Sequence, residues 1–160
     1  MIKIDIICVG SLKERFLKEG CEEYLKRLKS YAKVNVVELN EYKCSQNPSE
    51  NEILQVIQKE GERIIAKIPK NSYVIPMCIE GQMLSSEEFS KKIENIAVDG
   101  NCQITFIIGG SFGLSKDVKN LGNFKMSFGK LTLPHQLMRV VLLEQIYRAF
   151  SIANNSKYHK

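Results

Sequence analysis

The residues best suited to bind a ligand lie in two short stretches of the C-terminal half. The first, residues 109–114, reads Gly-Gly-Ser-Phe-Gly-Leu and follows an apolar run. Two adjacent glycines permit positive φ and let a ligand approach the backbone closely. The second, residues 128–136, leads through a glycine, a bend and Pro134 into a long apolar segment. A loop held in this way at the start of a helix suits a small polar ligand.

The glycine turn matches neither of the common phosphate-binding loops. Its glycine spacing differs from the dinucleotide-binding pattern, and no Gly-Lys-Ser/Thr is present as in a Walker A loop. Taken alone, the turn is equally well a tight connection between a strand and a helix. Nucleophilic catalysis is disfavoured, because the chain has no Gly-x-Ser-x-Gly elbow and no carboxylate at a suggestive spacing from either histidine.

Polar residues on the long apolar segment differ in what they can do. Arg139 has no acidic residue three or four positions away, so it is a candidate for phosphate or substrate contact. Glu144 and Arg148 are four apart and are expected to pair with each other. His135 begins the helix, where the helix dipole disfavours a cationic imidazole, and we interpret it as a neutral, structural histidine.

Composition indicates one domain with a sizeable core. The chain has 160 residues, of which 44% are apolar and 26% charged. Five cysteines occur in an odd count without close pairs, which favours reduced thiols over disulfides. With only two histidines and no clustered ligands, no metal site is expected. The net charge of +5 favours an anionic partner without identifying one.

Neither end of the chain indicates a membrane or export signal. No apolar run approaches the length of a membrane span. The N-terminal apolar run contains Asp5 and lacks a small-residue cleavage site, so it is interpreted as a strand. These features predict a cytoplasmic protein with no membrane partner.

Strands and helices are expected to alternate along the chain. We expect strands at residues 2–9, 34–39, 72–79, 103–108 and 124–128, and helices after Ser11 and at residues 50–68, 86–97, 115–121 and 137–153. Glu80–Gln82 is expected to form a turn. This alternation predicts an α/β fold with a mostly parallel sheet flanked by helices.

Two features of these elements are unusual for a simple α/β protein. Pro76 lies in an apolar strand, which indicates a sheet edge, a bulge, or a place where the ladder stops so that a ligand can enter. Residues 137–153 are apolar at twelve of seventeen positions, so this helix must be covered on more than one side. A second copy of the chain is the simplest cover. The basic face of the first helix, with Lys13, Arg15 and Lys18, is either solvated or contacts phosphates.

Three segments in order resemble the RlmH family, which comprises ribosomal RNA large-subunit methyltransferases of the SPOUT class. They are Ile107–Leu114, Leu131–Arg139, and Tyr147–Phe150 with the ending Tyr158–Lys160. Each motif alone is weak, but three at these separations form a specific pattern. The resemblance covers the whole chain and implies a single SPOUT methyltransferase domain over residues 1–160.

The resemblance implies a SPOUT-type fold with a deep trefoil knot near the C-terminus, an exception to the usual topology rules. The knot would span roughly residues 73–160, and its loops would bind S-adenosylmethionine in a bent shape. The positions that match the family's cofactor site are Met77, Gly109, Phe128, Gly129, Lys130, Leu131, Thr132 and Leu133. Backbone groups of the last loop, with apolar side chains such as Met77 and Leu133, would hold the adenine.

The resemblance also implies the reaction and the partners. Members form homodimers through the terminal helix. They methylate the 3-nitrogen of a pseudouridine in 23S rRNA of the assembled ribosome, and DNA is not expected as a partner. This nitrogen must lose a proton, and we predict that Arg139, Tyr158 and His159 hold or deprotonate the base. The tail would act in its own subunit or at its partner's cofactor; the other interpretation of the tail is terminal disorder.

Two other functions remain open at this point. The chain could be a SPOUT methyltransferase that acts on tRNA or another RNA. It could also be a non-enzymatic α/β protein that binds RNA or nucleotides. Donor binding separates the last hypothesis from the other two, and methyl transfer to different RNAs separates the remaining pair.

Overall fold

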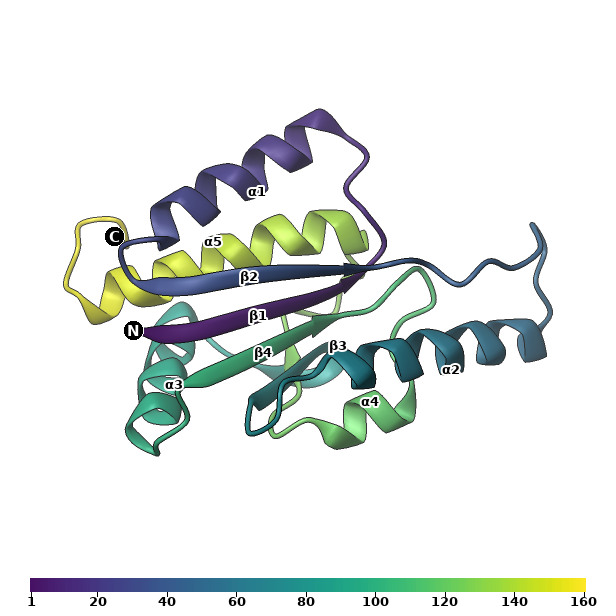
Figure 1. Ribbon diagram of the computed structural model, residues 1–160. Coiled ribbons are helices and arrows are strands. Elements are labelled where there is room, and N and C mark those ends of the chain that lie inside the picture. The colour runs from purple at the N-terminus through teal and green to yellow at the C-terminus, as the bar shows by residue number, and fades with distance from the viewer.

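The computed structural model describes residues 1–160, in which five strands alternate with five helices (Figure 1). The strands form one parallel sheet in the order β2-β1-β4-β3-β5, which confirms the predicted α/β fold. The elements are β1 (Ile2–Val9), α1 (Arg15–Leu28), β2 (Ala32–Leu39), α2 (Glu50–Lys67), β3 (Tyr73–Met83), α3 (Ser86–Val98), β4 (Gln103–Ile108), α4 (Lys116–Leu121), β5 (Met126–Ser127) and α5 (His135–Ala153).

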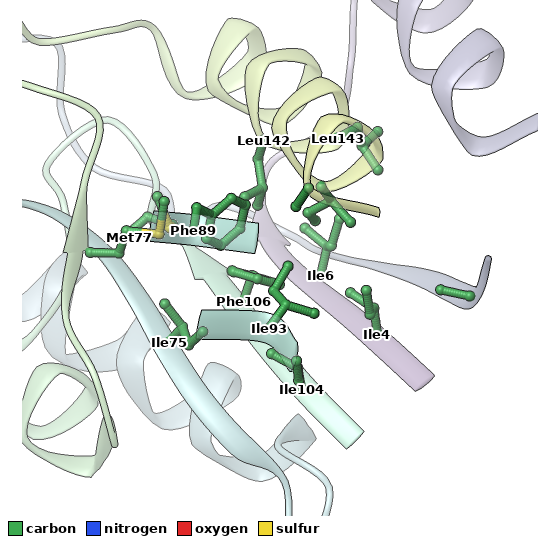
Figure 2. Close-up of a cluster of buried hydrophobic side chains, with 14 of the residues drawn as sticks. Ile4, Ile6, Ile75, Met77, Phe89, Ile93, Ile104, Phe106, Leu142 and Leu143 are labelled. Carbon is green, nitrogen blue, oxygen red and sulfur yellow. The ribbon is translucent and has the colours of Figure 1, made fainter. Parts of the chain in front are cut away.

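Helices cover both faces of this sheet, with α1 and α5 on one side and α2 and α4 on the other (Figure 1). Because side chains alternate along a strand, β1 sends Ile4 and Ile6 into one core and Ile7 and Val9 into the other. The larger core joins the sheet to α1, α3 and α5. Figure 2 shows it, with Leu142 of α5 and Phe89 of α3 over the strands.

Serine side chains cap the starts of three helices. Ser49 accepts a hydrogen bond from the Glu52 backbone N–H (3.2 Å), and Ser115 does the same for Val118. At Ser85 a complete capping box forms with the carboxylate of Glu88. Each cap satisfies a backbone donor that would otherwise have no partner in the first turn.

The helix expected after Ser11 does not use this serine as its cap. The helix α1 begins only at Arg15, and its N-cap residue Glu14 makes no side-chain capping hydrogen bond. Ser11 lies too far upstream to cap it. The intervening residues instead run towards α5, where the Lys13 backbone N–H donates to Gln136 Oε1 (3.1 Å).

The turn predicted at Glu80–Gln82 is also wrong, because β3 continues through it to Met83. Here β3 pairs with β5, which is limited to Met126 and Ser127 instead of the expected 124–128. A Cβ on Gly81 would lie 2.6–2.8 Å from backbone atoms of Met126. This glycine therefore serves a close crossing of two backbones rather than a turn.

Pro76 marks the end of a ladder, one of the three outcomes predicted for it. The pairing of β3 with β4 runs from Tyr73↔Ile104 to Pro76↔Ile107 and stops there. From Met77 onwards β3 pairs with β5 instead. Proline has no N–H to donate to a neighbouring strand. The ladder between β3 and β4 therefore ends at Pro76, and the two strands separate beyond it.

Much of the apolar surface of α5 is covered within one chain. Its residues Leu142, Leu143 and Ile146 are fully buried on the sheet. On one side, Val140 packs against Gly20 of α1, and on the other the Ser90 hydroxyl of α3 donates to the Ala149 carbonyl (2.7 Å). The composition of this helix therefore does not by itself require a second copy.

None of the helices is long and apolar enough to cross a bilayer. The trefoil knot and the domain limits stay predictions.

Candidate functional site

A cavity of about 520 Å³ opens at the carboxyl ends of β3 and β4, where the two strands part. Its volume is in the range of small-ligand sites, and this edge of a parallel sheet is where α/β proteins usually bind them. Its walls come from the end of β3, the glycine turn after β4, the segment from β5 to α5, and Lys119 of α4. The lining includes Met77–Glu80, Ile108–Ser111, Gly113, Leu114, Met126–Gly129, Leu131–His135 and Met138.

Every predicted cofactor residue except Lys130 lines this cavity. They come from three separate stretches: Met77 follows the proline, Gly109 opens the glycine turn, and the rest belong to residues 128–133. The fold thus brings together positions up to 56 residues apart in the sequence, from 77 to 133. Their role in cofactor binding stays a prediction.

The glycine turn folds back tightly on itself. The Gly113 N–H donates to the Gly110 carbonyl (3.1 Å), and Gly113 has a φ of +86°. A Cβ on Gly109 would lie 2.9 Å from the carbonyl carbon and oxygen of Gly113. The turn therefore has no space for a side chain at Gly109, and its backbone forms the cavity wall directly.

The loop after β5 carries backbone groups that are free to meet a ligand. The N–H and carbonyl of Lys130–Leu133 make no hydrogen bond within the chain. The loop is held at its start by Ser127, whose hydroxyl accepts from the Gly129 N–H (3.1 Å) and donates to the Gly129 carbonyl (3.0 Å). A cavity wall with free donors and acceptors fits a ligand such as adenine, which has both kinds of group at its edge.

Arg139 is paired, so the sequence-based argument that it has no partner is wrong. Its Nη1 donates to Glu38 Oε2 (2.6 Å) and its Nη2 to the Gly10 carbonyl (3.0 Å). Glu38 is the last residue but one of β2 and lies 101 positions from Arg139, so a count of helical spacings could not find it. Arg139 is 2% exposed and does not line the cavity, although the preceding Met138 does. Its catalytic role stays a prediction.

His135 lines the cavity at the start of α5. Its Nε2 is buried, has no hydrogen-bond partner, and lies 3.6 Å from Glu41 Oε1. The glutamate belongs to the connection after β2. This imidazole nitrogen therefore points towards the ends of β1 and β2, next to Gly10. The sequence predicts only a structural role for His135.

The C-terminal tail packs against α5 through the side chain of Tyr158. The Tyr158 hydroxyl donates to Glu144 Oε1 (3.0 Å), and its ring meets the Tyr147 ring edge-on at 4.8 Å. Burial and the bond to Glu144 raise the pKa of Tyr158 well above its ordinary value. Its phenol is therefore protonated at neutral pH.

The tail cluster also contains His159 and the predicted pair of Glu144 with Arg148. Arg148 Nη2 donates to Glu144 Oε1 (2.6 Å), which confirms that pair. His159 lies with Nδ1 at 3.2 Å from Arg148 Nη1 and Nε2 at 2.8 Å from Glu87 Oε1. Glu144 and Glu87 were not identified as site residues, because their contacts with the tail depend on how it folds back.

The tail cluster and the cavity occupy different parts of α5. Glu144 and Arg148 follow His135 by 9 and 13 positions, which correspond to about 14 Å and about 20 Å along a helix axis. No residue of the cluster lines the cavity. Within one chain, the structure does not bring Tyr158 and His159 together with the predicted cofactor residues.

All five cysteines are free, as predicted. Burial raises the pKa of the Cys8 thiol to about 12, and it raises that of Cys78 in the cavity wall. Thiols in this state are poor nucleophiles at neutral pH. The cavity therefore offers binding surface rather than a reactive sulfur.

Comparison with known proteins places the whole chain in one family. The family model described as "Predicted SPOUT methyltransferase" matches residues 2–159. Proteins named "Ribosomal RNA large subunit methyltransferase H" are similar over 99% of this chain and their entire length. The identities are 58% in Leuconostoc mesenteroides, 55% in Streptococcus gordonii and 52% in Enterococcus faecalis.

Solved structures with much lower sequence identity share the fold. A probable methylase family protein from Haemophilus influenzae is 13% identical with a TM-score of 0.54, covering 98% of this chain and 70% of that one. A putative methyltransferase from Legionella pneumophila, solved with its cofactor SAM, is 12% identical with a TM-score of 0.51, covering 93% and 66%. From the family model and the full-length relatives together, the chain belongs to the SPOUT methyltransferase family and, within it, to the ribosomal RNA large subunit methyltransferase H group.

Proposed function

We propose that this protein transfers a methyl group from S-adenosylmethionine to the 3-nitrogen of a pseudouridine in 23S rRNA. The observation that carries the proposal is its identity of 52–58%, over the full length, to proteins named for this class of reaction. The cavity also supports it, because the three predicted cofactor stretches converge on one site of suitable volume. The assembled ribosome is the proposed substrate and the cytoplasm the proposed place of action.

Donor binding is assigned to the backbone of the loop after β5. The free N–H and carbonyl groups of Lys130–Leu133 would bond to the edge of the adenine, while Met77 and Leu133 pack against its faces. The donor supplies a methyl group already attached to a positively charged leaving group. The chain's own tasks are therefore to align the acceptor nitrogen and to take up its proton.

Tyr158 and His159 are proposed to hold the acceptor base and to assist proton removal. Both side chains sit in a network with Arg148 and two carboxylates, Glu144 and Glu87, so a proton has acceptors nearby. Arg139 would contribute indirectly, by holding the first turns of α5 in place beside the cavity. Its guanidinium bonds these turns to the Gly10 carbonyl and to Glu38.

A homodimer is proposed because the cavity and the tail must meet for methyl transfer. Reacting atoms have to approach to roughly 3–3.5 Å, whereas two to four helical turns separate the tail cluster from His135 in one chain. Two copies related by a twofold axis, packed through α5 in opposite directions, would set the tail of each against the cavity of the other. Phe16 and Leu137 are large apolar side chains left exposed at the starts of α1 and α5, where such a contact would cover them.

RNA contact is assigned to the basic start of α1. Lys13, Arg15 and Lys18 are exposed, and Lys13 is tied to the first turn of α5 beside the cavity. A positive charge of this size attracts RNA without selecting a sequence. Selectivity would then come from the shape of the ribosome around the target base.

Transfer of label from methyl-labelled S-adenosylmethionine tests the proposal. The substrates are purified assembled ribosomes, separated subunits and tRNA, followed by nucleoside analysis of the labelled RNA. The proposal predicts label at a pseudouridine in 23S rRNA of assembled ribosomes. Label confined to tRNA would favour a related enzyme with another substrate, and absence of donor binding would favour a non-enzymatic nucleotide- or RNA-binding protein.

A further inference from the structure

The cavity wall is almost free of charge. Of the side chains that line it, only Glu80 and Lys119 belong to the acidic and basic residue types, and His135 is the one other titratable group besides the Cys78 thiol. The rest of the lining is apolar, glycine, hydroxyl or proline. A ligand that carries opposite charges at one end has therefore only one place in this cavity where both can be matched.

Glu80 and Lys119 come from opposite sides of this place. Glu80 lies in β3, four residues after Pro76, and Lys119 lies on α4, which follows the glycine turn. Lys119 Nζ contacts Glu80 Oε1 directly as an ion pair. The Lys119 side chain is 25% exposed and that of Glu80 is 55% exposed, so the pair sits at the rim, where both groups can still turn towards a ligand.

The Glu80 carboxylate is charged at neutral pH. The hydrogen bond from Lys119 holds the pKa of Glu80 below its ordinary value, and the charge of Lys125 acts in the same direction. An exposed ion pair of this kind contributes little to stability, because water screens it. Little free energy is therefore lost when the two side chains give up their contact with each other and bind a ligand instead.

We propose that Lys119 and Glu80 bind the amino-acid end of the methyl donor, Lys119 its carboxylate and Glu80 its ammonium group. The amino-acid end is a zwitterion at neutral pH, with its ammonium and carboxylate groups on the same carbon, and the rim pair offers the complementary arrangement. The proposal rests on the proposed function, which places the donor in this cavity. It adds the orientation: adenine towards the loop after β5 and the amino-acid end towards α4.

The structural alternative is that the pair only fastens α4 to β3. In that case, breaking it would loosen the wall and weaken every ligand of the cavity alike. The two roles are therefore separated by comparing a ligand that has the amino-acid end with one that lacks it. S-adenosylhomocysteine has this end and 5′-methylthioadenosine lacks it, and both are adenosyl thioethers.

The test is calorimetric binding of both compounds to the full chain. Lys119→Ala and Glu80→Gln are compared with Lys116→Ala, which removes an exposed lysine from the same helix outside the cavity. We expect each rim variant to weaken S-adenosylhomocysteine by roughly tenfold, as for loss of one charge-assisted hydrogen bond, and to leave 5′-methylthioadenosine unchanged. Lys119→Arg should retain most of the affinity, and Lys116→Ala should bind like the wild type.

Equal weakening of both compounds would reduce the pair to a structural fastening and overturn the proposal. No change with either compound would overturn it as well. If the wild type binds the two compounds equally tightly, the amino-acid end is not recognised, and the proposal fails while the proposed function stands. If the wild type binds neither, the proposed function itself fails. Unchanged binding of 5′-methylthioadenosine also shows that the variants are folded.

Discussion

Glu60 is a buried carboxylate directly behind the cavity wall. Its Oε2 accepts from the Tyr42 backbone N–H (3.0 Å), whereas its Oε1 is buried without a partner. A Cβ on Gly110, in the glycine turn, would lie 3.0 Å from Oε1. Burial raises the pKa of Glu60, Glu41 adds to the effect, and the Tyr42 bond and Arg63 oppose it. Glu60 thus holds the connection after β2 through Tyr42 and lies against the glycine turn, where its charged form is poorly solvated.

Replacement of Glu60 should make stability less dependent on pH. Because folding raises the pKa of this carboxyl, the folded state binds its proton more readily, and stability falls as pH rises above the ordinary glutamate pKa through the raised one. Glu60→Gln keeps the acceptor for Tyr42 and removes the charge. We expect its free energy of unfolding, relative to that of the wild type, to increase as the pH rises above the ordinary glutamate pKa, measured by urea denaturation.

The matched control for this prediction is Glu62→Gln on the same helix. Glu62 is exposed and pairs only with Lys59 at 3.7 Å, so its replacement should change stability little. A difference between wild type and Glu60→Gln that stays constant, or shrinks, as the pH rises would contradict the account of Glu60.

At the scale of elements, the site depends on how β3, β4 and α5 end or begin. The strands part at Pro76, the glycine turn closes the gap from one side, and the loop after β5 closes it from the other. The turn has no room for a side chain at Gly109, because this residue faces the backbone of Gly113. Its shape is therefore a condition of the cavity rather than a consequence of ligand binding.

Gly109→Val should abolish donor binding and leave the proposed dimer intact. A Cβ already meets the backbone of Gly113 at 2.9 Å, so valine must distort the turn, while α5 lies on the other side of the cavity. Calorimetry with S-adenosylhomocysteine and light scattering measure the two effects. Retained binding would show that the turn is not part of the donor site.

The elements could be predicted from the sequence because their signals are local. The serines before α2 and α3 and the proline in β3 each act within a few residues, and the structure shows them in these roles. Gly81 was misinterpreted, since a glycine that forms a turn and one that permits a close crossing look alike in a sequence. The contact of Arg139 with Glu38, 101 positions away, could not be inferred from helical spacing. The fold decides which of these distant residues meet.

At the scale of the whole molecule, the two halves of the proposed reaction site lie apart. The cavity holds the predicted donor residues, and the tail holds Tyr158 and His159 in a cluster around Glu144 and Arg148. Both chain termini lie at the end of the sheet away from the strand tips that form the cavity (Figure 1). The account therefore requires that one copy complete the site of another.

Deletion of residues 158–160 should spare donor binding and abolish turnover. A mixture of this deletion with Gly109→Val tests whether the tail acts across the dimer, because each variant alone lacks one half of every site. Heterodimers would contain one complete site, and random assembly should restore about a quarter of wild-type activity. Normal turnover by the deletion alone would remove the tail from the mechanism, and an inactive mixture of proven heterodimers would place its action within one chain.

The most direct test of the central claim is a crystal structure of the protein with S-adenosylhomocysteine. The account predicts density in the cavity, with adenine against the backbone of Lys130–Leu133 and the thioether between Met77 and the glycine turn. It also predicts that the chain after β5 is threaded as a trefoil knot. Ligand density elsewhere on the molecule, or an unthreaded chain, would contradict the account.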